Sequence, residues 1–258
     1  MSKTPTGRFV WFEYSSADAK KAQGFYGELF GWTTKEMKAE GAPGPYTMIA
    51  VGDDTIGGYW PPPPAGAPQH ASWISHLQVE DAAASAAKVK SLGGSVKMDP
   101  MEVGGQGTFA VVADPTGAVF SLWAPKKPEG TGDFKGKPGT WVWNELYTND
   151  PDKAVAFYQA LAGFTVDKMD MGEMGTYQVL NFDGKGRAGA MKSPMPNIPP
   201  NWLPYIQVED TDRTAERAKK LGGEVVVPPT DIPDVGRFAV LKDNQGAAIG
   251  ILKPNPRS

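Results

Sequence analysis

Residues 11–32 read WFEYSSADAKKAQGFYGELFGW, and residues 143–164 read WNELYTNDPDKAVAFYQALAGF. In the first stretch, alternating side chains over residues 9–15 predict a strand. Residues 16–18 are of types that often cap the start of a helix, and a series of apolar residues follows them. Gly31 is the expected end of this helix. Ala22, Phe25 and Leu29 of that series share one helical face. The second stretch repeats the pattern, so each copy predicts a strand followed by a helix.

The similarity continues well beyond these stretches. QVED occurs at Gln78 and again at Gln207, and LGG occurs at Leu92 and again at Leu221. We therefore interpret the chain as two copies of one module, the first over residues 7–125 and the second over residues 139–254. Between them, residues 126–138 are polar and rich in Gly and Pro, which is typical of a linker.

Each predicted module contains the same series of elements twice. In the first module, short strands are expected near residues 34–37, 46–51 and 55–60 after the first helix. A second strand at 73–79 and a helix over 81–92 follow, and then strands near 95–98, 108–113 and 118–123. This order gives two βαβββ units per module, which places the chain in the α+β class.

Composition excludes several classes of function. The chain is 40% hydrophobic and 21% charged, as expected of a globular protein, and its net charge is −3 with a pI near 5.5. Because the basic residues are scattered, we expect neither a nucleic-acid nor a membrane partner. The absence of cysteine excludes disulfides and sulfur-ligated metals. We expect a cytoplasmic protein, as a monomer or a homodimer.

Several motifs together resemble those of a known superfamily. They are GFYGELFGW and AFYQALAGF at the helix ends, VED followed by LGG, and DPTGAVFSLW at residues 114–123. In this combination the chain is similar to the vicinal-oxygen-chelate superfamily, which includes glyoxalase and bleomycin-resistance proteins. More narrowly, it resembles a two-module bacterial branch labelled glyoxalase-like or hydroxylase. The resemblance implies a curved mixed sheet in each module around a cavity that holds a small molecule, often with a divalent metal.

The metal-ligand positions implied by the resemblance carry unsuitable side chains. Superposition of the motifs places these positions on Trp11, Ile74, Ser121, Trp143, Leu203 and Gly250. Aromatic and alkyl side chains offer no lone pair, and a single serine hydroxyl is a poor ligand. A site with two histidines and one carboxylate would need both His70 and His76, and His70 lies outside the predicted strand. We expect no metal and no cofactor, with an unusual metal site as the alternative.

Glu13 and Glu145 are the candidate catalytic residues. Since alternate side chains of a strand share a face, Glu13 points the same way as Trp11, and Glu145 the same way as Trp143. The resemblance implies that this face lines the cavity. His76 and Tyr205 hold the equivalent place in the second half of each module, so we expect Glu13 across the cavity from His76, and Glu145 across it from Tyr205. The alternative for each carboxylate is a structural role, within its module or at the junction between modules.

Aromatic side chains are candidates for stacking on a planar ligand, although each can also be a core residue. They are Trp11, Tyr59, Trp60, Trp73, Trp123, Trp141, Trp143, Tyr177 and Trp202. With His76 and Tyr205, we single out Trp11 and Trp143 as ligand-binding residues.

Three functions follow from these patterns. The first is a small-molecule-binding protein that works without a metal. The second is a glyoxalase-like lyase, isomerase or hydroxylase-like enzyme with Glu13 or Glu145 as base. The third is an interaction protein without a small-molecule ligand.

Overall fold

Two modules of the same architecture make up the computed structural model, which describes residues 6–37, 46–60, 70–127, 134, 136–195 and 197–256. The elements of module 1 are β1 (Phe9–Ser15), α1 (Ala19–Phe30), β2 (Thr33–Met37), β3 (Tyr46–Val51), β4 (Asp54–Tyr59), β5 (Ser72–Gln78), α2 (Ala82–Ser91), β6 (Ser95–Val103), β7 (Gly107–Ala113) and β8 (Val119–Pro125). Those of module 2 are β9 (Trp141–Thr148), α3 (Pro151–Ala162), β10 (Thr165–Asp170), η1 (Gly172–Met174), β11 (Thr176–Phe182), β12 (Lys185–Lys192), β13 (Asn201–Gln207), α4 (Thr211–Lys220), β14 (Glu224–Ile232), β15 (Gly236–Lys242) and β16 (Ala248–Pro254). The exact module boundaries proposed from the sequence stay a prediction.

Local signals set the ends of the first helix in each module. The Asp18 side chain accepts a hydrogen bond from the Lys21 amide at 3.0 Å, and Asp150 does the same for the Lys153 amide at 3.1 Å. Gly31 and Gly163 end these helices at φ values of 73° and 77°, a backbone conformation that favours glycine. The helix predicted between Asp18 and Gly31 therefore forms where the sequence places it.

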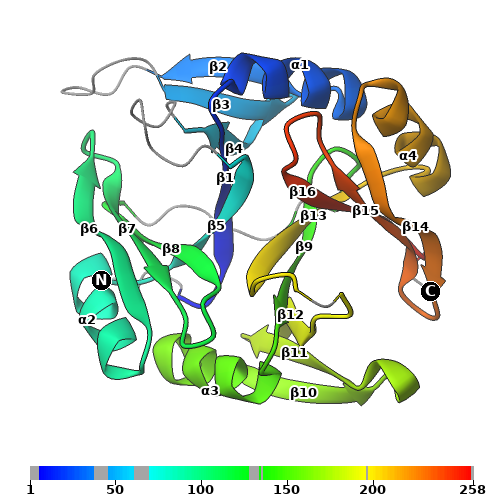
Figure 1. Cartoon of the computed structure of the whole chain (residues 1–258). Coiled ribbons are helices and arrows are strands. Elements are labelled where there is room, and N and C mark those ends of the chain that lie inside the picture. Colours follow the sequence, from blue (N-terminus) through cyan, green and yellow to red (C-terminus); the bar gives the residue numbers. More distant parts are fainter. Residues whose placement is uncertain are drawn as a thin grey trace.

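Each module forms one eight-stranded mixed sheet (Figure 1). In module 1 the strand order is β2-β3-β4-β1-β5-β8-β7-β6, and module 2 repeats it with β10-β11-β12-β9-β13-β16-β15-β14. The two central strands, β1 and β5, are antiparallel, while each is parallel to its other neighbour, β4 or β8. The predicted fold class, α+β with two βαβββ units in each module, is confirmed.

The two faces of β1 have different neighbours. Phe12 and Tyr14 point toward module 2, where the Phe12 ring lies 4.3 Å from that of Trp141 and the Tyr14 hydroxyl donates to Asp243 at 2.6 Å. The ring of Tyr26 in α1 packs against Tyr14 on the same side. We call this the outer face of the sheet, and the opposite face, which carries Trp11 and Glu13, the inner face.

Contacts between the modules are reciprocal. Asp243, in the β15–β16 turn of module 2, accepts hydrogen bonds from Tyr14 and Tyr26 of module 1. Asp114, in the β7–β8 turn of module 1, accepts one from Tyr158 of module 2 at 3.1 Å. Helices α1 and α4 lie side by side, as do α2 and α3 (Figure 1). Each module thus buries its outer face partly against the other.

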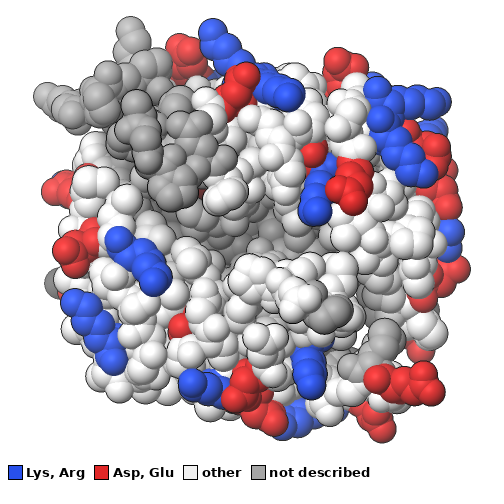
Figure 2. Space-filling view, in the orientation of Figure 1, with Lys and Arg blue, Asp and Glu red and all other residues white. Residues whose placement is uncertain are grey.

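Charged side chains of both signs are interspersed around the face shown in Figure 2, and its centre carries few of them. This face has no broad area of a single sign. Among the described helices, none is both long and apolar enough to cross a bilayer.

Candidate functional site

Glu13 lies on the inner face of module 1, 5% exposed, and its two carboxylate oxygens have different partners. Oε1 accepts the hydroxyl of Tyr46 in β3, and Oε2 lies 3.1 Å from Nε2 of His76 in β5. The Trp11 indole donates to the same Tyr46 hydroxyl at 3.0 Å. Glu13 and His76, expected on opposite sides of a cavity, are therefore in direct contact, and Glu13 does not lie at the junction between modules.

Strand register explains why His76 reaches this cluster. In the sheet, His76 is the direct partner of Trp11 on one side and of Ser121 on the other, whereas Ile74 is the partner of Glu13. Trp11 and Ile74, which the motif superposition gives as equivalent positions, are not register partners, and each lies two residues from the other's partner. Because β1 and β5 are antiparallel, equivalent positions of the two units lie diagonally across this strand pair. The Ser121 hydroxyl donates to the Ala110 carbonyl at 3.2 Å.

A glycine in β4 makes room for Tyr46. Gly58 is the register partner of Glu13, and a Cβ atom at Gly58 would overlap the Tyr46 hydroxyl. Only glycine lets the phenol cross β4 to reach the carboxylate. Burial, and then the negative charge of Glu13, raise the pKa of Tyr46 well above its ordinary value. The hydroxyl therefore keeps its proton at neutral pH and donates to Glu13.

In module 2, Glu145 has Tyr205 where Glu13 has His76, and a further tyrosine, Tyr147, lies nearby. Tyr205 donates to Glu145 Oε2 at 2.9 Å, and the Tyr205 and Tyr147 hydroxyls lie 3.1 Å apart. The Trp143 indole donates to Tyr177 at 2.8 Å, the counterpart of the Trp11 to Tyr46 bond. Burial, and then the charge of Glu145, raise the pKa values of Tyr147, Tyr177 and Tyr205. Glu145 is thus surrounded by protonated hydroxyls, and Tyr205, expected across a cavity, contacts it directly.

Module 2 also fills its inner face with its own side chains. A Cβ atom at Gly250 would overlap the ring of Tyr205, so the glycine that replaces Ser121 admits this ring. Leu203, Tyr205, Val240 and Leu252 form a hydrophobic cluster separate from the main core. The described residues of module 1 form no second cluster of this kind. The two inner faces therefore differ, although the modules share one fold.

Metal ligation does not fit the residues present. Within the described ranges, no group of three or more His, Cys, Asp or Glu side chains comes together. His70 is exposed and does not join His76 and Glu13. Glu13 and His76 supply two donors that contact each other directly, and Trp11 has no lone pair to add.

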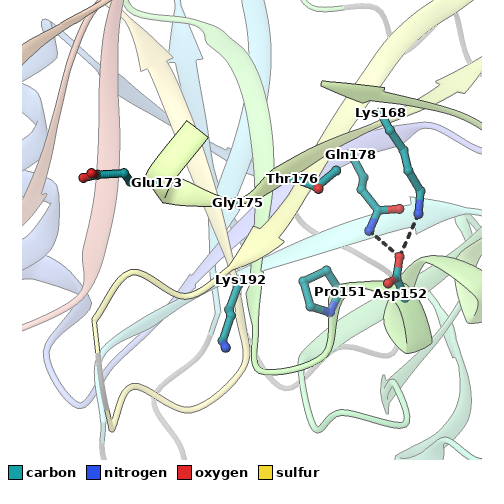
Figure 3. A pocket seen from close by; sticks show the side chains of 8 residues that line it. All are labelled: Pro151, Asp152, Lys168, Glu173, Gly175, Thr176, Gln178 and Lys192. Carbon is teal, nitrogen blue, oxygen red and sulfur yellow. Dashed lines mark hydrogen bonds and ion pairs between the residues drawn. The ribbon is translucent and has the colours of Figure 1, made fainter. Parts of the chain in front are cut away.

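A surface pocket of about 400 Å³ lies away from these residues, at the start of α3 (Figure 3). Its lining includes Lys168 and Gln178, which both point toward Asp152 and bond to it at 2.9 and 3.0 Å. Lys168, then Gln178, lower the pKa of the Asp152 carboxyl. None of the predicted site residues lines this pocket.

Some residues of the site were not predicted from the sequence. Tyr46 and Tyr147 were not among the predicted residues, and Tyr177 was expected to stack on a ligand rather than to bond near a carboxylate. A signal was present, since Tyr46 and Gly58 recur at the same spacing as Tyr177 and Gly189. Several other stacking candidates lie on the outer face and are core residues, among them Tyr59, Trp73, Trp141 and Trp202.

Comparison with known proteins identifies the relatives of this chain. The family model for the glyoxalase/bleomycin resistance protein/dioxygenase superfamily matches residues 8–122 and 141–251. CFP32 of Mycobacterium tuberculosis, whose name describes it provisionally as a glyoxylase, is 38% identical over 96% of this chain and 95% of its own. The anthracycline biosynthesis protein DauV of Streptomyces sp. strain C5 is 34% identical over 98% of this chain and 95% of its own.

Solved structures agree with this fold. The Mn(II)-bound glyoxalase from Novosphingobium aromaticivorans gives a TM-score of 0.64 at 16% identity, over 96% of this chain and 82% of that one. The 2,3-dioxygenase LapB from Pseudomonas sp. KL28 gives 0.65 at 13% identity, over 100% and 95% of the two chains. At this identity the likeness concerns the fold alone.

Proposed function

Because this chain belongs to the glyoxalase/bleomycin resistance protein/dioxygenase superfamily, we propose that it binds a small aromatic or partly apolar molecule on the inner face of module 1, without a metal. The observation that carries the proposal is the buried cluster of Glu13, His76 and Tyr46. Ligand sites typically combine aromatic walls with a few placed polar groups, so a mixed polar and aromatic inner face is suited to a ligand with both characters.

Module 1 is favoured over module 2 by the contents of the two inner faces. In module 2, Tyr205 and its hydrophobic neighbours occupy the inner face. In module 1 the same row holds an imidazole and the small Ser121 in place of Tyr205 and Gly250. We assign module 2 a supporting role, and its Trp143 and Tyr205 to packing around Glu145.

Relatives support the ligand class in different ways. DauV is named for anthracycline biosynthesis, and anthracyclines are planar polycyclic aromatic molecules. CFP32 carries a glyoxylase name. The first name favours an aromatic ligand, while the second favours the glyoxalase-like alternative.

A catalytic function is the second candidate, supported by the contact of Glu13 with an imidazole. Oε2 of Glu13 lies 3.1 Å from Nε2 of His76, so a proton that one of these groups takes from a bound molecule can be shared with the other. In this scheme Glu13 is the base and His76 shares the proton. Glu145 is a weaker candidate, because only phenols with raised pKa values surround it. An interaction protein with no small-molecule ligand is the third candidate.

A thermal-shift screen tests the proposal. The protein is treated with a chelator, its metal content is measured by elemental analysis, and it is screened against planar aromatics, aldehydes and glutathione adducts. A ligand at 100 times its Kd adds about 2.7 kcal/mol of stability, so binding raises Tm measurably. We expect aromatic compounds to raise Tm in the metal-free protein. Shifts that occur only after Mn²⁺ or Zn²⁺ is restored would contradict metal independence, and no shift with any compound would favour the interaction protein.

A further inference from the structure

Gln78, the last residue of β5, lies two positions beyond His76, so both side chains leave the strand on the inner face. The residue is 1% exposed, and its side-chain nitrogen Nε2 is buried without a hydrogen-bond partner in the described part of the chain. Buried amide groups are nearly always paired, because an unpaired donor loses its hydration without compensation. An unpaired donor on a proposed binding face therefore indicates that a bound molecule supplies the acceptor.

Aromatic residues lie on the strands beside Gln78. Across the sheet, Gln78 is the register partner of Trp123, and Trp123 is the partner of Phe109. The Trp60 ring, from the other half of the module, meets Phe109 edge-on with ring centres 5.2 Å apart. Both Trp60 and Trp123 keep part of their surface exposed. The inner face thus combines one free donor with rings that can contact a planar molecule.

Module 2 lacks this combination at the matching position. Gln207 holds the place of Gln78 in the second QVED motif, but it is partly exposed, and its amide is not among the buried unpaired groups of the described residues. Its register partner is Leu252, which belongs with Phe238 to the hydrophobic cluster. The difference between the modules therefore extends from His76 to the end of the same strand.

We propose that Gln78 is a ligand-binding residue of module 1, and that the ligand is a planar aromatic molecule bearing a carbonyl oxygen. In this arrangement Nε2 of Gln78 donates to the carbonyl, while Trp60, Phe109 and Trp123 contact the ring system. The proposal rests on the proposed function and adds to it the chemical class of the ligand. It involves binding only, with no covalent step.

Two matched probes test this inference, anthraquinone-2-sulfonate, which has ring carbonyls, and anthracene-2-sulfonate, which lacks them. Their affinities are measured by fluorescence titration for the full-length protein and for the variants Gln78→Met and Gln207→Met. We expect the quinone to bind on the order of tenfold more tightly than the hydrocarbon, the ratio for one hydrogen bond to a neutral group. Gln78→Met should abolish this preference, while Gln207→Met should leave it unchanged. The Tm of Gln78→Met should not fall, because the substitution removes an unpaired polar group.

The other outcomes separate this inference from the proposed function. If both probes bind equally well, and Gln78→Met changes neither affinity, the role of Gln78 is overturned while aromatic binding stands. A fall in the Tm of Gln78→Met with the preference intact would show that the amide supports the fold, and would also overturn it. If neither probe binds the wild-type protein, both the inference and an aromatic ligand are contradicted.

Discussion

Glu13 and Glu145 hold the same position in the repeat, yet one carboxylate meets an imidazole and the other meets phenols. The His76 imidazole has two ring nitrogens that can donate or accept a hydrogen bond, whereas the Tyr205 phenol keeps its proton because burial raises its pKa. A single exchange, His76 for Tyr205, thus gives the two modules different chemistry. The smaller ring in module 1 also leaves more of the inner face to a ligand.

Gly58→Ala should damage the site of module 1 more than the fold. The new methyl group would overlap the Tyr46 hydroxyl, which must then leave Glu13. Because the displaced group is the end of a side chain, we expect a loss of about 1–3 kcal/mol in the free energy of unfolding. Affinity for an aromatic ligand found by the thermal-shift screen should fall at least about tenfold, as one hydrogen-bonding partner is displaced.

The matched control is Gly189→Ala, which displaces Tyr177 in module 2 in the same way. Its unfolding free energy should fall by a similar amount, measured by urea denaturation, while ligand affinity stays at the wild-type value. Equal losses of affinity in the two variants would contradict the assignment of the site to module 1.

For the side chains of the site, the sequence predicted neighbours along and across one strand pair, but not partners from more distant strands. Alternation places Trp11 and Glu13 on one face, and the equivalent halves of the module place His76 opposite Glu13. Tyr46 reaches the same carboxylate from β3 across β4, and this contact depends on the absence of a side chain at Gly58. Such a long-range contact has no local periodic signal.

The strand β1 contributes both to the candidate site and to the contact between the modules. Its inner face supplies Glu13 to the site, and its outer face supplies Phe12 and Tyr14 to the contact with module 2. The β15–β16 turn docks on that outer face through Asp243, which is 4% exposed. Asp243 also accepts the backbone amides of Gln245 and Ala247 at 2.8 and 3.0 Å, so one carboxylate holds the turn and both phenols.

Asp243→Ala should therefore destabilise the whole protein. The substitution leaves the hydroxyls of Tyr14 and Tyr26 without their buried acceptor, and we expect a loss of about 2–5 kcal/mol in the free energy of unfolding. Asp53→Ala, in an exposed turn of module 1, is the control and should change that value by less than about 0.5 kcal/mol. Urea denaturation followed by tryptophan fluorescence measures both. A wild-type midpoint for Asp243→Ala would show that the turn does not depend on this carboxylate.

The elements themselves were predictable because local signals agree with the periodic pattern. The strand expected at residues 9–15 and the helix that ends before Gly31 form as predicted. The strand expected near 95–98 instead extends to Val103 as β6, with register shifts on either side of Met98. The prediction ended at Met98, two residues before Pro100, but proline is tolerated on an edge strand, and β6 is the edge of the sheet.

Tyrosine hydroxyls take part in the sites around Glu13 and Glu145 and also in the contact between the two modules. Burial is the largest cause of the raised pKa of Tyr14, Tyr26, Tyr46, Tyr59, Tyr158, Tyr177 and Tyr205. A folded-state pKa above the unfolded value of about 10 means that the unfolded chain loses its protons first. The stability contributed by these groups is thus complete below about pH 10 and declines as the pH rises further.

We therefore expect the free energy of unfolding to fall steeply above about pH 10. Each buried tyrosine contributes a slope of up to about 1.4 kcal/mol per pH unit. Tyr59→Phe is the informative variant, because the pKa of Tyr59 is raised by burial and then by the charge of Asp243. Urea denaturation between pH 8 and about pH 11.5 should show a shallower decline for this variant. Equal slopes for the two proteins would indicate that Tyr59 ionises freely in the folded state.

We assign the ligand site to module 1 and a supporting role to module 2. Calorimetric titration of three metal-free proteins tests this assignment. An aromatic ligand found in the screen is titrated into the wild type, Glu13→Gln and Glu145→Gln, with circular dichroism confirming that each is folded. We expect Glu13→Gln to lower the affinity at least about tenfold, and Glu145→Gln to bind like the wild type. Loss of binding in Glu145→Gln alone, or in neither variant, would contradict a ligand site at Glu13 on the inner face of module 1.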